Sequence, residues 1–213
     1  MPLIVIAGKP CTGKTTFANL LVAALRERGS AVQLVNEETL QITKAAGYAT
    51  STSEKATRGA IKSRTDHHLT AETYVVVDSL NYIKGFRYEL HCSARTFRTP
   101  QCVVWVACAD TTADVWNETR VKEGGDGYEA KIMDDLRMRF EAPNEANRWD
   151  SPLFRVCLSA DVTSADVTTG AGDAVIADAG AVAGVASALQ GISLTGEAGS
   201  SSSSSSSTGE ANC

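Results

Sequence analysis

Short runs made mostly of apolar residues recur along the first 158 residues of the chain and predict buried strands. The runs cover Leu3 to Ala7, Ala31 to Val35, Tyr74 to Val77, Gln101 to Cys108 and Leu153 to Leu158. Runs without polar alternation are typical of parallel strands that helices cover on both faces. The pattern therefore predicts five parallel strands in one sheet.

Segments with apolar residues at helical spacing lie between these runs. The clearest helix is expected from Lys14 to Arg28, where Gly29 supplies a C-cap. Further helices are expected from about 53 to 69 and from 129 to 140. Another helix is expected to follow a loop at 81 to 88 and to end at about 96. Residues 36 to 52 are interpreted as a long loop of the kind that is often functional. The alternation predicts an α/β fold, a doubly wound five-stranded parallel sheet with helices on both faces.

The composition changes after residue 158 to Ala, Gly, Ser, Thr and Asp, and a serine run fills Ser200 to Ser207. We therefore expect a domain at 1–158, a linker at 159–195 and a disordered serine-rich tail at 196–213. Only Ala174 to Leu189 has helical apolar spacing, with Gly180 and Gly184 each costing a helix about 1 kcal/mol relative to Ala. A weak helix is expected there.

Composition narrows the function classes. The 213 residues suit one α/β domain, and a net charge of −5 argues against a globally basic nucleic-acid binder. The six cysteines contain no Cys-x-x-Cys pair, so neither a redox dithiol nor a zinc site is indicated. The N-terminus lacks the pattern of a signal peptide, and no apolar run reaches membrane-spanning length. We expect a cytoplasmic, or also nuclear, protein that does not contact membranes.

A glycine-rich loop joins the first predicted strand to the first predicted helix. It consists of Gly8-Lys9-Pro10-Cys11-Thr12-Gly13-Lys14-Thr15, followed by Thr16. Such a loop aims backbone N–H groups inward and forms an anion site at a helix N-terminus. The spacing predicts a P-loop that binds ATP with Mg²⁺, in which Lys14 reaches the β- and γ-phosphates and the Thr15 hydroxyl is a metal ligand.

Asp78 follows four apolar residues at the end of the third predicted strand. Ligands of open α/β sheets gather at the carboxyl ends of strands, where a carboxylate holds Mg²⁺ directly or through water. We therefore predict Asp78 to be the second metal ligand and a catalytic residue. A turn or N-cap aspartate is the alternative interpretation.

Three long motifs resemble one known family. They are GKPCTGKTT at 8–16, DSLNYIKGFRYEL at 78–90, and RFEAP at 139–143 followed by RWDSPLF at 148–154. With them the chain resembles the Elongator-associated regulatory ATPases, first named as killer-toxin-insensitivity proteins, which are relatives of the L-seryl-tRNA(Sec) kinase. The resemblance covers residues 1 to 158. It implies an ATPase that acts with the Elongator complex in modifying wobble uridines of tRNA.

The resemblance also implies site residues after the second strand. Glu37, Glu38 and the Ser53-Glu54-Lys55 helix start with Arg58 match a region that carries acidic residues in the family. Glu37 stands where the family often has Asp. Because a carboxylate just beyond the second strand lies near the γ-phosphate in this topology, Glu37 is the candidate for orienting the attacking water. For Glu54, Lys55 and Arg58 a solvated helix start is an equal alternative.

Two further places are candidates for nucleotide contacts. Residues 117 to 120, which precede a Gly-rich loop, are similar to the lid of small P-loop kinases, so Arg120 is expected to neutralise phosphoryl charge. An ordinary surface arginine is the alternative. Arg148 and Trp149 are candidates for lining the adenine site through stacking, with core packing the alternative for the tryptophan.

Two functions remain open at this point, and a third is disfavoured. The first is a regulatory ATPase whose loops at 36–55 and 79–88 switch between arrangements that a partner reads. The second is a kinase that phosphorylates a tRNA-borne or small-molecule hydroxyl. The third is a scaffold that binds nucleotide without hydrolysing it. Such a scaffold would lack the metal-binding or water-orienting groups, whereas Thr15, Asp78 and Glu37 are all present.

Binding of tRNA is a further implication of the resemblance, and one part of the family pattern that bears on it is not matched. Family members usually continue into a helical C-terminal domain that contributes to tRNA binding, whereas here an Ala/Gly/Ser-rich tail follows. Four cations on or after the 79–88 loop are nevertheless expected to form a local basic face, with a solvated helix face as the alternative. They are Lys84, Arg87, Arg95 and Arg98.

Overall fold

The protein is described from a computed structural model that places residues 1–158 and 179–190. Residues 159–178, which include the start of the expected weak helix, and residues 191–213, which include the serine-rich tail, lie outside the described residues.

Within this part of the chain, five parallel strands form a single sheet in the order β2-β3-β1-β4-β5. The strands are β1 (Leu3–Ala7), β2 (Ala31–Asn36), β3 (Thr73–Asp78), β4 (Gln101–Ala107) and β5 (Leu153–Cys157). The central strand β1 is wholly buried because both of its edges are paired and both of its faces are covered. The predicted strands and their parallel arrangement are confirmed.

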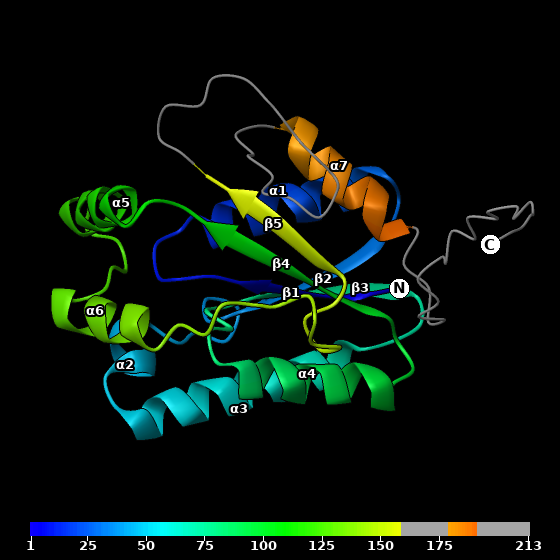
Figure 1. Ribbon diagram of the computed structural model, residues 1–213, viewed down its shortest axis with the longest axis horizontal. Helices are drawn as coiled ribbons and strands as arrows, with labels where there is room; N and C mark the ends of the chain where they lie inside the picture. The colour runs from blue at the N-terminus through cyan, green and yellow to red at the C-terminus, as the bar shows by residue number, and fades with distance from the viewer. Residues whose placement is uncertain (159–178, 191–213) are drawn as a thin grey trace, which may run out of the picture.

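Helices cover the two faces of the sheet and its carboxyl edge (Figure 1). The helices are α1 (Lys14–Glu27), α2 (Lys44–Tyr48), α3 (Ser51–His68), α4 (Lys84–Thr96), α5 (Asp110–Lys122), α6 (Ala130–Met138) and α7 (Ala179–Gln190). Helices α1 and α7 lie on one face, α3 and α4 on the other, and α2, α5 and α6 lie beyond the ends of the strands. The carboxyl edge of the sheet is therefore the end at which α2, α5 and α6 gather.

The packing of α1 follows from its sequence. Phe17, Leu21 and Leu25 recur at helical spacing and are buried against Ile4 and Val104 of the sheet. Each such side chain contributes about 1.5–3 kcal/mol on burial. This packing holds the N-terminus of α1 at the carboxyl end of β1, where the glycine-rich loop lies.

The C-terminal helix α7 belongs to the same core. Val182, Val185 and Ala186 are buried and pack with the residues of α1. A helix is thus present where apolar spacing predicted a weak one. The packed core extends beyond the 1–158 range expected for the domain.

Two helices of the carboxyl edge were not predicted from apolar spacing. Within the expected long loop at 36–52 the chain forms α2, which Thr43 caps by accepting a hydrogen bond from the Ala46 N–H. Helix α5 buries only Ala113 and Asn117, so it offers no apolar stripe for a sequence pattern to detect. None of the helices described here combines the length and apolar character needed to cross a membrane.

Candidate functional site

The glycine-rich loop, which joins β1 to α1, packs closely against the backbone of β4. A side chain at Gly8 would place its Cβ 2.3 Å from the carbonyl oxygen of Val106, and Gly13 has a φ of 83°. Cys11 also adopts a left-handed backbone, with φ 58°. The loop therefore leads into the first turn of α1, whose N–H groups are available to an anion.

Lys14 is buried within this loop, and the residue is 8% exposed. Its Nζ donates a hydrogen bond of 2.5 Å to the carbonyl oxygen of Lys9, which also accepts one from Thr12. Burial lowers the pKa of Lys14 to about 8, although the negative charge of Asp78 acts in the opposite direction. The structure thus places a poorly compensated cation beneath the loop.

Asp78 ends β3 directly beside β1 and is 2% exposed. Burial raises the pKa of its carboxyl to about 6, and hydrogen bonds from Thr15 and Asn36 together with the charge of Lys14 only partly offset this effect. The charge of Glu37 raises the pKa further. Asp78, Thr15 and Lys14 therefore meet at one place, as the sequence predicted.

A cavity of about 510 Å³ opens in front of these residues. Of the predicted site residues it is lined by Cys11, Thr12, Gly13, Lys14, Thr15, Thr16, Glu37, Asp78 and Arg120. Gly8, Lys9 and Pro10 shape the loop behind it and are not part of its lining. A cavity of this size fits a small-molecule ligand.

Glu37 reaches the cavity from the turn that follows β2. The turn is fixed by Asn36 and Thr39, which exchange hydrogen bonds of 2.8 and 3.0 Å. The Oε1 atom of Glu37 accepts hydrogen bonds from the hydroxyls of Tyr48, at 2.5 Å, and Ser79, at 2.6 Å. Sequence reasoning did not single out Tyr48 or Ser79, although Ser79 directly follows Asp78.

Arg120 reaches the cavity from the last turns of α5. Its Nη1 lies 3.7 Å from the Sγ atom of Cys11 in the glycine-rich loop. The loop after α5 also contacts α2, because the Asp126 carboxylate accepts a hydrogen bond of 2.8 Å from the Lys44 backbone N–H and pairs with the Lys44 ammonium at 3.5 Å. The segment resembling a kinase lid therefore closes one side of the cavity.

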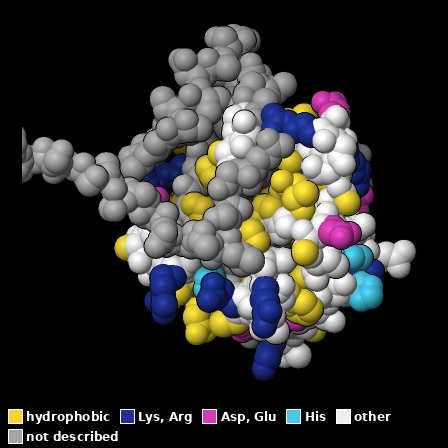
Figure 2. Space-filling view, turned by 90° about the vertical axis from the view of Figure 1, so that its right-hand side faces the viewer, with side chains coloured by type: hydrophobic (Ala, Val, Ile, Leu, Met, Phe, Trp, Pro, Cys, Tyr) yellow, Lys and Arg dark blue, Asp and Glu magenta, His cyan; other side chains and the backbone are white. Residues whose placement is uncertain are grey.

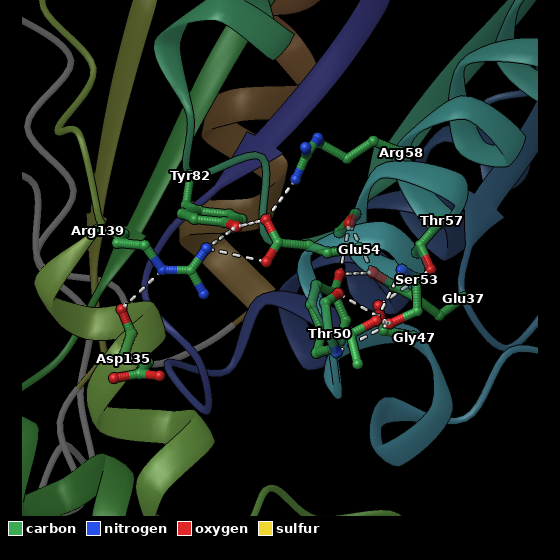
Figure 3. Close-up of polar contacts among 12 residues, drawn as sticks. Glu37, Gly47, Thr50, Ser53, Glu54, Thr57, Arg58, Tyr82, Asp135 and Arg139 are labelled. Atoms are coloured by element: carbon green, nitrogen blue, oxygen red, sulfur yellow. Dashed lines mark hydrogen bonds and ion pairs between the residues drawn. The ribbon is translucent and has the colours of Figure 1, made fainter.

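Glu54 occupies a separate cluster that joins α3 to the segment after α6 (Figure 3). Glu54 is 4% exposed, and its carboxylate accepts hydrogen bonds from Tyr82, Arg58 and Arg139, the last at 2.9 Å. Burial would raise the pKa of Glu54, but these hydrogen bonds outweigh it and hold the pKa below its ordinary value. Glu54 and Arg58 thus link elements and do not line the cavity, and Lys55 is exposed.

Arg87 was wrongly predicted to be part of a basic face. Its side chain is completely buried and forms an ion pair with Asp150, with an Nε to Oδ1 distance of 2.7 Å. Its Nη1 also donates to the Asn81 carbonyl oxygen. Arg87 faces inward because α4 packs this side against the segment that leads to β5, so it stabilises the fold and is inaccessible to a partner.

The expected stacking of Arg148 and Trp149 on an adenine ring is also wrong. The Trp149 ring packs edge-on against Tyr88 of α4, at 5.4 Å between centroids. Its carbonyl oxygen accepts a hydrogen bond from Gln101, the first residue of β4, whereas the glycine-rich loop follows the last residue of β1. Neither residue lines the cavity.

The exposed cations near Trp149 lie toward the end of the molecule opposite the glycine-rich loop. Arg95, Arg98 and Arg148 are exposed, and the charges of Arg95 and Arg148 both contribute to lowering the pKa of His91 after the larger effect of burial. Figure 2 shows Lys and Arg side chains spaced along the lower margin of this end, beside hydrophobic ones. The basic surface at this end therefore contains Arg95 and Arg98 but not Arg87, and Lys84 lies at the other end of α4, where it pairs with Glu141.

The fold and the site together define the class of the protein. A glycine-rich loop after the first strand of a parallel 2-3-1-4-5 sheet, with a buried lysine and an aspartate at the end of the neighbouring strand, is a P-loop kinase-like architecture. The family described as chromatin associated protein KTI12 matches residues 1–179. The chain belongs to the KTI12 family.

Individual relatives agree with this assignment. The chain is 40% identical to the KTI12 homolog of Xenopus laevis over 156 residues, which are 73% of this chain and 56% of the relative. It is 39% identical to KTI12 of Saccharomyces cerevisiae over 169 residues, 76% of this chain and 53% of the yeast protein. The chain thus spans little more than half the length of these curated relatives.

Solved structures share the fold. Kti12 of Chaetomium thermophilum, in complex with ADP-AlF3, is 38% identical, with a TM-score of 0.69 over 75% of this chain and 90% of that one. A putative kinase from Chloroflexus aurantiacus reaches a TM-score of 0.56 at 15% identity over 73% of this chain and 87% of that one. The second likeness shows the fold alone.

Proposed function

We propose that this chain binds ATP with Mg²⁺ and hydrolyses it. The observation that carries the proposal is the meeting of Lys14 and Asp78 at one cavity, both buried and neither fully compensated by the protein. Perturbed ionisable groups in a cleft are typical of functional sites. The phosphates of a nucleoside triphosphate would supply the negative charge for Lys14, and a divalent cation would supply the positive charge for Asp78. The Chaetomium relative, in a complex with ADP-AlF3, supports this choice of ligand.

Each predicted site residue has a role in this proposal. Lys14 holds the β- and γ-phosphates as a point charge, and the N–H groups of residues 11 to 16 surround them. The Thr15 hydroxyl and the Asp78 carboxylate are hard oxygen donors of the kind that Mg²⁺ prefers. Magnesium, when bound, neutralises charge on the phosphate oxygens. Glu37 orients the attacking water, and Arg120 neutralises charge on the transferring group.

We further propose that this ATPase is a regulatory factor of the Elongator complex in tRNA wobble-uridine modification, acting in the cytoplasm and also in the nucleus. Membership of the KTI12 family supports the nuclear location, because the family is described as chromatin associated, and the Elongator role rests on the family resemblance of the three sequence motifs. The segments 36–44 and 78–80, which line the cavity, are placed to respond to the γ-phosphate. Elongator would then recognise one nucleotide state.

A P-loop kinase is the second candidate, because the α5 segment with Arg120 closes the cavity as a kinase lid does. The two functions differ in where the γ-phosphate goes. Thin-layer analysis of γ-labelled ATP, with and without tRNA, distinguishes them. We expect free phosphate from the wild-type chain, none from Lys14→Ala, and no label on RNA. Labelled RNA would establish the kinase instead.

Stimulation by tRNA is expected to depend on the exposed cations at the end of the molecule opposite the glycine-rich loop. Since Arg87 is buried, the informative change is charge reversal of Arg95 and Arg98, with Lys55→Glu as a control on an exposed lysine outside that surface. The double variant should lose the tRNA effect and keep basal hydrolysis, and in the wild type the effect should fall as salt rises. Unchanged stimulation would exclude this surface as the RNA contact.

A further inference from the structure

The carboxylate of Glu37 is held asymmetrically. Both hydrogen bonds found among the described residues reach Oε1, from the hydroxyls of Tyr48 and Ser79, which lie 3.4 Å from each other. Within the same residues no hydrogen bond to Oε2 is present. One oxygen is therefore fixed by the protein, and the other is left as an acceptor at the cavity that Glu37 lines.

Tyr48 is itself held firmly. It is 6% exposed, and its ring lies against that of Tyr128 with the centroids 5.9 Å apart. Burial, together with the negative charge of Glu37, raises the pKa of Tyr48 well above its ordinary value. The hydroxyl therefore keeps its proton and acts as a donor to the carboxylate.

The backbone around Tyr48 is also tightly packed. The preceding carbonyl, that of Gly47, accepts a hydrogen bond of 3.3 Å from Thr57 of α3. A Cβ at Gly47 would lie 2.9 Å from Ile42 and 3.1 Å from Thr57, so the chain leaves room only for glycine. Helix α2 is thus docked on α3, and Tyr48 has a fixed position relative to the turn that carries Glu37.

We infer that Tyr48 and Ser79 are positioning residues for the carboxylate of Glu37, and that they leave Oε2 as the acceptor for the attacking water. The inference rests on the proposed ATP hydrolysis. In that step the water oxygen bonds to the γ-phosphorus while one water proton passes to Oε2. The bond from phosphorus to the bridging oxygen breaks, and its electron pair leaves on ADP. Tyr48 and Ser79 act through Glu37 and do not touch the substrate.

The inference is tested by removing single hydroxyls. Tyr48→Phe and Ser79→Ala should each lower kcat for ATP hydrolysis by about tenfold, as part of the roughly hundredfold or larger effect of a general base, with KM for ATP unchanged. Tyr74→Phe removes the hydroxyl of another buried tyrosine, on β3 outside the cavity lining, and should leave both constants unchanged.

The decisive readout is the combination with Glu37→Gln. If the hydroxyls act only through the carboxylate, Tyr48→Phe should have no further effect on kcat in the Glu37→Gln background. An additional tenfold loss there, or a raised KM in the single variant, would overturn the inference and indicate a structural role. Ser79→Ala provides the same test should Tyr48→Phe not fold.

Failure of the inference is distinguishable from failure of the proposed function. If Glu37→Gln lowers kcat while Tyr48→Phe and Ser79→Ala do not, only the positioning role is overturned. If Glu37→Gln retains the full rate, the catalytic role of Glu37 and the inference fail together. A wild-type chain that releases no phosphate would overturn the proposed hydrolysis as well.

Discussion

The protein buries two sets of opposite charges and treats them differently. Arg87 and Asp150 are both fully buried and meet through a two-point ion pair, with distances of 2.7 and 3.4 Å. Their remaining hydrogen-bonding groups are also used, because Arg87 donates to the Asn81 carbonyl and Asp150 accepts from the Asn144 N–H. This pair is complete without any ligand.

Lys14 and Asp78 are nearly as buried, but no salt bridge joins them among the described residues. Burial favours the neutral form of each side chain. It lowers the pKa of Lys14 to about 8 and raises the pKa of Asp78 to about 6. A buried charge without a full partner costs stability. The comparison teaches that the saturated charges in this fold are structural, whereas the incompletely neutralised ones mark the place where we propose that a charged ligand binds.

The largest expected effect comes from breaking the complete pair. Arg87→Met leaves Asp150 as a buried carboxylate without its main partner, so the free energy of unfolding should fall by about 3–5 kcal/mol. Urea denaturation measures this. A loss below about 1 kcal/mol would show that Arg87 and Asp150 are not coupled as the structure indicates.

The matched change at the incomplete site should behave in the opposite way. Lys14→Met keeps the volume of the side chain but removes a poorly compensated buried cation, so the free energy of unfolding should change by less than about 1 kcal/mol or rise. ATP hydrolysis should nevertheless fall at least about a hundredfold, because the variant lacks the ammonium group that would hold the β- and γ-phosphates. A destabilisation as large as that of Arg87→Met would contradict the comparison.

Asp78→Asn should sharpen the comparison through pH. The folded-state pKa of about 6 lies above the ordinary value of 3.8, so the folded chain keeps a proton that the unfolded chain has lost. From this group, the unfolding free energy of the wild type should fall by up to about 3 kcal/mol between roughly pH 4 and pH 7. The variant should lack this fall. Parallel pH profiles for the two proteins would contradict the assigned pKa.

The same variant should also separate catalysis from binding. Asp78→Asn should reduce Mg²⁺-dependent turnover more than nucleotide affinity, because the largest effect of the metal is on transition-state charge. Steady-state rates and equilibrium binding at saturating Mg²⁺ measure the two quantities. Equal turnover of variant and wild type would argue against Asp78 as a metal ligand.

A small effect is expected at the Glu54 cluster, where the carboxylate has three hydrogen-bond donors. Arg58→Ala leaves Tyr82 and Arg139 on the carboxylate, so the unfolding free energy should fall by only about 1 kcal/mol. The matched control on the same helix is Lys62→Ala, whose more exposed pair with Asp66 should contribute about 0.3–0.5 kcal/mol. A loss comparable to that of Arg87→Met would show that Arg58 is not redundant.

The parts of the molecule that local patterns encode could be predicted from the sequence. The strands and α1 follow from apolar runs and helical spacing, and the glycine-rich loop and Asp78 follow from their places at strand ends. Arg87 could not be placed, because an arginine on a helix is typical of a solvated face and its partner lies 63 residues away. The contacts of Tyr48 and Ser79 with Glu37 likewise depend on how three separate segments meet at the sheet edge.

The central claim is that the incomplete charges at the glycine-rich loop are completed by a Mg²⁺–nucleotide complex. The most direct test is the melting temperature of the chain with Mg²⁺, ADP and aluminium fluoride, compared with the chain alone. We predict a clear rise for the wild type and for Tyr48→Phe, and none for Lys14→Met, because binding to the native state raises stability. No rise in the wild type, or an equal rise in Lys14→Met, would contradict the account.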